Sequence, residues 1–481
     1  MFARGLIVYS LITAPLFRPS SIDYPEDVSA CFPDDRLPPM RLFVRRLLST
    51  LALLLCAYTF VPPAQAQDQP QVFRGATVYP ISAPPIDNGV VVVQNGIIQA
   101  IGAEGEVEVP QAAVVHDMSG KVLMPGIVDT HSHIGQVDGG DQSAPAHPGV
   151  RTLDAVNVRH SSINRARAGG ITTVNVLSGS GHLLSGQTTH LKLRDGETVE
   201  DLLTCENPLA DICGGIKMAN GTNSIRDNPA FPGTRARSAA IARQMFVDAQ
   251  AYRAKKEAAE SEDDMPPTDL GKEALIEVLD GRRIVHFHTH RHDDILTVLR
   301  LKREFGFEVV LHHVSEGWRV ADEIAAADVP ASIIVLDSPG GKHEAVNLYF
   351  RTGAVLEEAG VDVAYHTDDF ITDSRLFLRS AAFGVRAGMS EEKAMEAMTL
   401  AGARMLGMED RIGSLEEGKD ADLVVLSGDP ISVYTDVLET WVEGQKVFDR
   451  SNPADLDFAT GGYGVYDDGT LHHHHGPASG E

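Results

Sequence analysis

Between residues 127 and 408, short apolar runs alternate with longer segments whose apolar residues recur at three- and four-residue spacing. Runs such as "ITTVNVLS" and "RRIVHFHTH" are typical of buried strands, and segments such as "DDILTVLRLKREFG" are typical of amphipathic helices. Alternating strands and helices over about 280 residues favour an α/β fold with a parallel sheet, and this length fits an eight-stranded barrel. We therefore expect a (β/α)8 TIM-like barrel over residues 127–408.

The two flanks of this region have a different pattern. Residues 67–126 contain short β-type runs, such as "GVVVVQNGIIQAIG", which Gly, Asn, Pro and Asp separate. The β character returns over residues 409–450, in "DADLVVLSG" and "VLETWVEGQKVFD". We expect the flanks to pair as the N-terminal and C-terminal parts of one β-sandwich domain beside the barrel.

The N-terminal residues predict an exported protein. A charged start at residues 41–46 precedes an apolar run over residues 47–58, and a small-x-small cleavage motif ends at Ala66. The run is short for a membrane span, so we interpret residues 40–66 as a signal peptide, with a membrane anchor as the alternative. Residues 1–39 would then be a misread upstream leader. The mature protein is expected to be periplasmic or secreted, without a stable membrane anchor.

Composition limits the partners of the chain. Its 481 residues carry a formal net charge of −26, which argues against nucleic-acid binding because phosphate backbones require clustered Lys and Arg. A small-molecule substrate is the expected partner, and a homo-oligomer stays open. Cys205 and Cys213 lie beyond the predicted signal, and in an exported protein they either form a disulfide or stay reduced.

Two further segments stand out by composition. Residues 254–281 are highly charged and predict a solvated helical insertion. Residues 451–481 predict a flexible tail, in which His472 to His475 are interpreted as a purification-tag remnant or part of the tail itself.

Histidines end several of the strand-like runs. In "MPGIVDTHSHIG", His131 and His133 are two positions apart and therefore face the same side of a strand. The run "VHFHTHRHDD" places His286, His288 and His290 on one face in the same way, with His286 deepest and expected in the core. Each group follows an apolar run, at the carboxyl end of a strand, where barrel active sites lie.

Two more runs end in candidate ligands. "VVLHHV" ends in His312 and His313, which are adjacent, so His312 is expected to face away from the interior if His313 faces inward. "VAYHTDD" ends in His366 and Asp368, which lie on the same face. Metal ligands from several strands can meet at this end of a barrel.

The spacing of the candidates fits one barrel register. A barrel of roughly 250 residues has about 31 residues in each βα unit. His288 and His313 lie about one such unit apart, and Asp368 follows His313 by about two. Lys217, in "GGIKMANG", follows His133 by about three units. These residues therefore fall at the ends of strands 1, 4, 5, 6 and 8.

The motifs together resemble those of a known family. "MPGIVDTHSHIG", "GIKMANG", "HTHRHDDI", "LHHVSEG", "YHTDDF" and "RIGSLEEGKDADLVVLSGDP" are similar to successive motifs of the amidohydrolase superfamily, in its imidazolonepropionase-like branch, over about residues 71–448. The resemblance implies a metal-dependent (β/α)8 barrel and a β-sandwich built from both ends of the chain. It also implies a set of metal ligands: His131, His133, Lys217, His288, His313 and Asp368.

Imidazole and carboxylate ligands suit Zn²⁺, with Mn²⁺ or Fe²⁺ as alternatives. Such a divalent metal activates water, and Asp368 is the expected catalytic base. One or two ions are expected, two if Lys217 is carboxylated, because a protonated lysine is a poor ligand. The candidate substrate contacts are His182, His290 and His366, and the alternative role for His366 is to orient a ligand.

The predicted function is hydrolysis of an amide C–N bond in an N-acyl amino acid, a dipeptide or a cyclic amide. One alternative is a deaminase with a single metal, for which Glu316 is the candidate base. Another is an exported metal-binding protein without catalysis, which would not need Asp368. "GTNSIR" replaces the family's GENPKR form, and Asp369 stands where a histidine often occurs, so specificity and metal number stay open.

Overall fold

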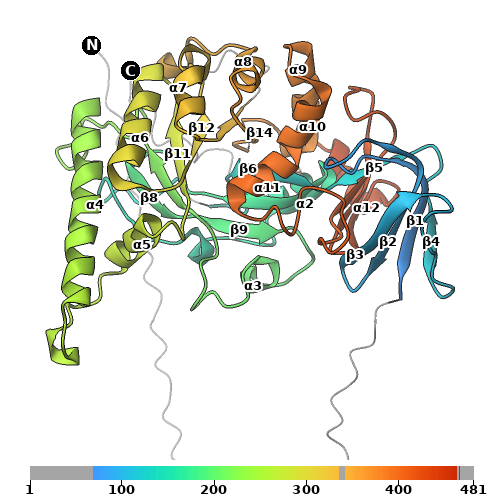
Figure 1. Cartoon of the computed structure of the whole chain (residues 1–481), viewed down its shortest axis with the longest axis horizontal. Helices are drawn as coiled ribbons and strands as arrows, with labels where there is room; N and C mark the ends of the chain where they lie inside the picture. The colour runs from blue at the N-terminus through green and yellow to red at the C-terminus, as the bar shows by residue number, and fades with distance from the viewer. Residues whose placement is uncertain (1–68, 138, 335–341, 370, 463–464, 466–481) are drawn as a thin grey trace, which may run out of the picture. The chain divides into compact units, whose positions relative to one another are not determined.

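The computed structural model describes residues 69–137, 139–334, 342–369, 371–462 and 465, which form an α/β protein with three sheets (Figure 1). The predicted upstream leader and signal peptide, and His472 to His475, lie outside the described residues. Among the described helices, none combines the length and the apolar character that crossing a membrane requires.

The largest sheet has eight strands and joins both ends of the chain. Its order is β17-β16-β15-β5-β1-β2-β3, and β4 pairs with β1. The contact between the two ends is antiparallel pairing of β5 with β15, and in Figure 1 the blue N-terminal strands lie beside the red C-terminal segment. The strands are β1 (Gln71–Val78), β2 (Ile86–Gln94), β3 (Ile97–Ala103), β4 (Val114–Asp117), β5 (Val122–Pro125), β15 (Leu423–Leu426), β16 (Val437–Val442) and β17 (Gln445–Asp449).

Local sequence explains the tight turns and the core of this sheet. Asn95 and Gly96 connect β2 to β3 with φ values of 54° and 76°, the left-handed pair that a two-residue hairpin turn prefers. Phe73 and Trp441 meet edge to face in the core at a ring separation of 5.0 Å, although they come from opposite ends of the chain. The sheet and its core therefore combine residues from both flanks.

Two smaller sheets carry the α/β part of the chain. The six-stranded sheet has the order β14-β13-β12-β11-β10-β8, and the three-stranded sheet has the order β6-β7-β9. Their strands are almost wholly buried, as expected for sheets that helices cover on the outside. The strands are β6 (Ile127–Ser132), β7 (Ile171–Val176), β8 (Leu184–Gln187), β9 (Thr189–Lys192), β10 (Ile216–Ala219), β11 (Val285–Thr289), β12 (Val309–His313), β13 (Ala331–Ile333) and β14 (Val363–Tyr365).

The α/β prediction is confirmed, but the sheets differ from a closed barrel of eight parallel strands. β10 to β14 pair in parallel, as do β6 and β7, whereas β8 and β9 run antiparallel to their neighbours. Thr188 separates β8 from β9, and its amide donates to Gly215 at 2.9 Å. At the other side, the amide of Asp368 donates to the carbonyl of His131 at 2.9 Å, so the two sheets meet at both edges.

Helices follow most strands of the two smaller sheets. The longest, α4, begins after its N-cap Thr234, whose side chain accepts from the amide of Arg237. α6 ends at Gly306, which adopts a φ of 77° at the helix terminus. The helices are α2 (Ser161–Ala168), α3 (Val199–Leu202), α4 (Arg235–Glu257), α5 (Leu270–Leu279), α6 (His292–Phe305), α7 (Ala321–Ala326), α8 (Thr352–Glu358), α9 (Arg379–Arg386), α10 (Glu391–Met398), α11 (Leu400–Leu406) and α12 (Pro453–Thr460).

Two segments are more ordered than the sequence predicts. The charged segment 254–281 contains α5, which buries Ala274, Leu275 and Val278 in the main core and is therefore only partly solvated. Residues 453–460, within the predicted flexible tail, form α12, which contacts α2. The high charge of the segment led to the prediction of a solvated helix, although α5 has an apolar face.

A buried ion-pair cluster connects the α/β part to the eight-stranded sheet. Lys192 of β9 is fully buried, and its Nζ lies 2.7 Å from Asp420 and 3.0 Å from Asp422, just before β15. Burial lowers the pKa of Lys192, but the charges of Asp422, Asp420 and Glu443 raise it by more, so its pKa lies above the ordinary value. The lysine thus stays charged and holds the two parts together.

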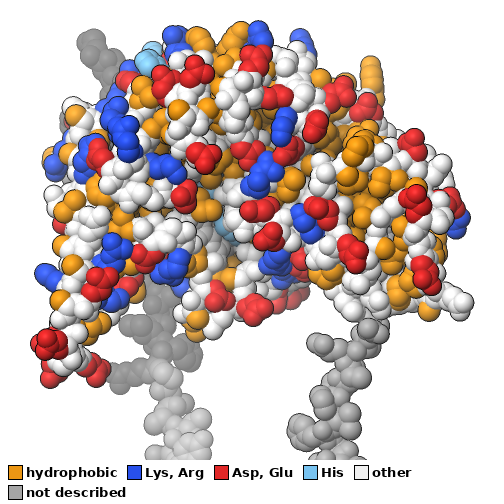
Figure 2. Space-filling view, in the orientation of Figure 1, with side chains coloured by type: hydrophobic (Ala, Val, Ile, Leu, Met, Phe, Trp, Pro, Cys, Tyr) orange, Lys and Arg blue, Asp and Glu red, His pale blue; other side chains and the backbone are white. Residues whose placement is uncertain are grey.

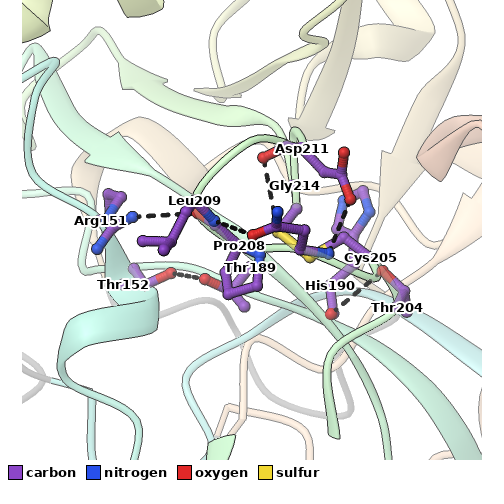
Figure 3. The surroundings of a disulfide bond; sticks show 12 residues. Arg151, Thr152, Thr189, His190, Thr204, Cys205, Pro208, Leu209, Asp211 and Gly214 are labelled. Atoms are coloured by element: carbon purple, nitrogen blue, oxygen red, sulfur yellow. Dashed lines mark hydrogen bonds between the residues drawn. A yellow bond between two sulfur atoms is a disulfide. The ribbon is translucent and has the colours of Figure 1, made fainter. Parts of the chain in front are cut away.

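Cys205 and Cys213 form a disulfide, which decides between the two possibilities that the sequence left open. Their Cα atoms lie 5.2 Å apart. The loop between them lies beside His190 of β9 (Figure 3). The amide of His190 donates to the carbonyl of Cys213 at 2.8 Å, and the amide of Thr204 donates to the carbonyl of His190 at 3.3 Å. The disulfide therefore fixes a loop against the edge of the three-stranded sheet.

Candidate metal centre

Side chains from β6, β10 and the end of β14 converge in the interior. His131 Nε2 lies 3.0 Å from Lys217 Nζ and 3.3 Å from Asp368 Oδ1. His133 Nε2 lies 3.0 Å from the same carboxylate oxygen. One oxygen of Asp368 therefore contacts both histidines of the HxH pair, and these three residues form one group of potential metal ligands.

A second group joins β11 to β12. The rings of His288 and His313 are 4.3 Å apart, and His290 lies 4.7 Å from His288 and 4.9 Å from His313. Their potential ligand atoms all lie within 4.8 Å of one another, and the three side chains are buried. On the face shown in Figure 2, acidic and basic side chains are mixed and little histidine surface appears.

His312 is placed differently from the prediction. Strand alternation predicts that it faces away from the interior, yet its ring lies 4.9 Å from His131, at the same separation as His313. The physical reason is backbone conformation, because His313 and Val314 have φ values of 71° and 50° and break the two-residue alternation. His312 forms a third potential ligand group with His131 and His366.

Hydrogen bonds fix the rings through their Nδ1 atoms. His133 Nδ1 lies 2.7 Å from the carbonyl of Leu177, and His290 Nδ1 lies 2.8 Å from Ser315 Oγ. A histidine that binds metal through one nitrogen usually has its other nitrogen held in this way.

His366 bridges two other side chains of the cluster. Its Nε2 lies 3.1 Å from Nδ1 of His313, and its Nδ1 lies 2.8 Å from Ser332 Oγ. The Nε2 atoms of His290 and His313 have no hydrogen-bond partner among the described residues. Buried nitrogens without partners are costly in a protein interior, and bound metal would satisfy them, so the residues fit a divalent ion.

The electrostatics of the cluster suit metal binding. Burial lowers the pKa of His131, His288 and His313 well below the ordinary value, so these rings are neutral at pH 7, as metal ligands must be. Burial raises the pKa of Asp368, but the hydrogen bond from His133 and the positive charges around it lower the pKa by more, which keeps this carboxylate ionised. Burial lowers the pKa of Lys217 to about 7.

Asp129 is a buried residue of this centre that sequence reasoning missed. Its carboxylate accepts from Thr367 Oγ1 at 2.5 Å and from the amides of Thr367 and His131 at 3.0 and 3.2 Å. These bonds connect β6 to the segment that carries Asp368. Burial raises the pKa of Asp129 to about 7. Asp129 precedes His131 by two residues, so strand alternation alone predicts that both side chains face the same side of β6.

Three other buried residues that the sequence analysis named make contacts of their own. His182 is buried, but its ring contacts are with His147 at 5.9 Å and Phe231 at 5.7 Å, and among described residues no ring contact joins it to the cluster. Asp369 lies 3.7 Å from Arg165, and burial raises the pKa of Asp369 to about 6. His286, expected in the core, is fully buried, and its Nδ1 lies 3.0 Å from His312 Nε2.

Glu344 and Lys342 are two further residues that the sequence gave no reason to select. Glu344 Oε1 is buried and lies 3.8 Å from His288 Nε2. Lys342 Nζ lies 3.8 Å from the same oxygen and donates to Asn223 Oδ1 at 3.2 Å. Both residues belong to a loop and a short 3-10 helix, His343–Ala345, where no periodic pattern marks a site.

Comparisons with known proteins identify the family of the chain. A family model described as "Amidohydrolase family" matches residues 238–448. The crystal structure of an amidohydrolase from Thermotoga maritima MSB8 is 35% identical and superposes with a TM-score of 0.74, covering 79% of this chain and 100% of that chain. The chain therefore belongs to the amidohydrolase superfamily, which confirms the resemblance that its motifs indicate.

More distant relatives carry several names. Amidohydrolase tasK of Hapsidospora irregularis is 28% identical over 391 residues, covering 75% of this chain, and the chain spans only 40% of that protein. Imidazolonepropionase of Clostridium tetani (strain Massachusetts / E88) is 25% identical over 416 residues, covering 76% of this chain and 92% of that protein.

Proposed function

We propose that this protein is a metal-dependent hydrolase that cleaves an amide C–N bond in a small molecule. The observation that carries the proposal is the place of Asp368, whose Oδ1 contacts Nε2 of both His131 and His133. A carboxylate in this position can serve both as a ligand and as a proton acceptor for water beside the ion. Zn²⁺ is the proposed metal, on the chemistry of the ligand set.

When bound, such an ion lowers the pKa of a water molecule and polarises a carbonyl. His131 and His133, at the end of β6, would hold that ion, and Asp368 would take the proton from the attacking water. Asp368 then delivers the proton to the leaving nitrogen, so that an amide gives a carboxylic acid and an amine. Asp129 keeps the segment of Asp368 aligned with β6 through its bonds to Thr367.

The substrate we propose is an amide that also carries a carboxylate, such as an N-acyl amino acid or a dipeptide. The support is Lys342, which lies 3.8 Å from Glu344 at the edge of the centre and 3.2 Å from Asn223. Its ammonium group is a cation beside Glu344, which itself lies 3.8 Å from His288 Nε2, and a lysine ammonium can pair with a substrate carboxylate. Asn223 belongs to the "GTNSIR" segment, which departs from the common family form.

Two alternatives have less support. The deaminase proposal needs Glu316 as base, but this carboxylate lies 2.5 Å from His292 Nδ1, 2.5 Å from Asn347 Nδ2 and 3.1 Å from the amide of His292. Those bonds use Glu316 to fix the start of α6. The proposal of a metal-binding protein without catalysis uses Asp368 only as a ligand and gives no role to a proton acceptor beside the ion.

Export and the complete barrel are also part of the proposal. The Cys205–Cys213 disulfide supports a periplasmic or secreted location, because disulfides persist in oxidising compartments. Contact between the two smaller sheets at both edges supports a (β/α)8-type barrel with one reversed segment. A β-sandwich from residues 67–126 and 409–450 agrees with the shared eight-stranded sheet.

The proposal is tested by turnover of N-acyl amino acids, dipeptides, cyclic amides and aminated bases by the metal-loaded protein. Release of an amine and a carboxylic acid supports amide hydrolysis, whereas release of ammonia from aminated bases alone would establish the deaminase instead. Substrates are paired with their methyl esters, and Lys342→Met is compared with wild type. We expect the free carboxylate to raise kcat/KM about tenfold or more in wild type and little in the variant.

A further inference from the structure

The end of the hairpin formed by α4 and α5 projects from the protein without a core of its own. The last buried residue of α4 is Tyr252, and none of residues 253–270, the arm, is buried. Tyr252 and Lys256 donate hydrogen bonds to Glu273 of α5 at 2.8 and 2.6 Å, which fix the base of the arm. Figure 1 shows α4 extending past the helices beside it. The arm is therefore a fixed projection whose surface is available to a partner.

The tip of the arm, residues 260–265, surrounds one apolar side chain with carboxylates. Glu262, Asp263 and Asp264 form a short 3-10 helix, and Met265 follows with 44% of its surface exposed. Within the part of the chain that the structure describes, these three carboxylates form no ion pair. In Figure 2 acidic side chains gather at the end of the hairpin. The tip therefore presents negative charge together with an exposed methionine.

A groove between α6 and α7 has the opposite charge. Its volume is about 660 Å³, and Leu296 and Leu299, which are partly buried against the main core, lie in it. Arg300 and Arg303 line it one helical turn apart, and neither pairs with a carboxylate among the described residues. Glu323 is the acidic residue of the lining, so the groove is positive overall and apolar inside.

We propose that the tip of the arm of one copy of this chain docks in the α6–α7 groove of a second copy. Met265 would lie on Leu296 and Leu299, and the carboxylates of the tip would face Arg300 and Arg303. An apolar centre inside a charged rim is the usual composition of a protein interface, in which methionine and arginine are enriched.

Two further observations favour a second copy as the occupant. Within one copy, no ion pair joins the tip to the groove over the described residues, so the complementary charges of both surfaces stay unused. The chain has a formal net charge of −26, so two copies repel each other unless local attraction opposes the repulsion, and the tip and the groove supply such attraction. Exchange of two arms about a twofold axis would close both contacts in a dimer.

The test measures self-association of the purified full chain by light scattering after gel filtration, over a range of protein concentrations. We expect wild type to associate as its concentration rises. Glu262→Lys with Asp263→Lys reverses the charge of the tip, and Arg300→Glu with Arg303→Glu reverses that of the groove. Each pair should raise the Kd of association about tenfold to a hundredfold, because like charges then meet.

A mixture of the two variants gives the decisive result. The reversed tip of one variant faces the reversed groove of the other, and the remaining tip and groove are both unchanged, so mixing should restore association. The matched control is Glu391→Lys with Glu392→Lys, on the exposed first turn of α10. It changes the net charge as much as the tip variant does, but association should not weaken.

The inference is overturned if wild type stays monomeric, if either reversed pair associates as wild type does, or if the mixture stays monomeric. Weakening of association by the control would also overturn it, because net charge alone would then explain the result. All substituted side chains are exposed, and circular dichroism checks that the variants fold. These measurements need neither metal nor substrate, so their outcome is independent of the proposed hydrolase activity.

Discussion

Lys217→Met should make the metal-free protein more stable at neutral pH. Lys217 is fully buried in β10, and burial lowers its pKa to about 7 from an ordinary value of 10.5. Between these two values the unfolded chain binds a proton that the folded chain does not, so protonation favours unfolding. The free energy of unfolding of wild type therefore rises with pH across this window, and methionine removes the effect.

The magnitude follows from the interval between the two pKa values. Each pH unit between them corresponds to about 1.4 kcal/mol, so the full effect is about 5 kcal/mol. Between pH 7 and pH 9, the stability advantage of Lys217→Met over wild type should fall by about 2 kcal/mol, because wild type gains stability as its unfolded state loses the proton.

The assay is chemical denaturation at pH 7 and pH 9 after metal removal with a chelator, followed by circular dichroism. Lys192→Met is the matched control, because Lys192 is also buried but its pKa lies above the ordinary value. Lys192 is then protonated in both states over this range, so the stability difference for this variant should not change with pH. If the difference in free energy of unfolding between Lys217→Met and wild type stays constant or grows from pH 7 to pH 9, the lowered pKa of Lys217 is refuted.

Three other variants test parts of the fold. Cys205→Ser removes the disulfide, whose short loop predicts a loss of about 2.5 kcal/mol, measured by denaturation with and without reductant; an unchanged midpoint would show that the bond does not form. Lys192→Met leaves two carboxylates buried without their cation and should cost about 3–5 kcal/mol at pH 7, and a loss below 1 kcal/mol would contradict the ion-pair cluster. Gly169→Ala directs a methyl group at the carbonyl oxygen of Ser374 and should lower stability by about 1–3 kcal/mol, whereas unchanged stability would place these segments further apart.

The fold class was predictable because it follows from the spacing of apolar residues and from the length of the region in which strands and helices alternate. The alternation of strand-like and helix-like segments gives the α/β class, and "GSLEEGKDADLVVL" with the HxH pair identifies the family. The reversed direction of β8 and β9 was not predictable, because a short buried strand has the same composition in either direction. α12 was missed because helix formation there depends on contact with α2.

The candidate site was predictable where residues follow strand periodicity. His131, His133 and Asp368 meet as their spacing implies, since each lies at a strand end. His312 departs from the rule because the backbone of His313 enters the left-handed region, which no side-chain pattern announces. Glu344 comes from a loop, where its position depends on the path of the whole chain rather than on any repeat.

The central claim, metal-dependent hydrolysis with Asp368 as base, is tested most directly by one comparison. Amide turnover is measured in wild type and Asp368→Asn at matched metal content, each before and after chelation and zinc reloading. The account predicts activity that chelation abolishes and zinc restores in wild type, and a loss of about 100-fold or more in kcat for Asp368→Asn that still binds metal. Full activity in metal-free protein, or in metal-loaded Asp368→Asn, would contradict it.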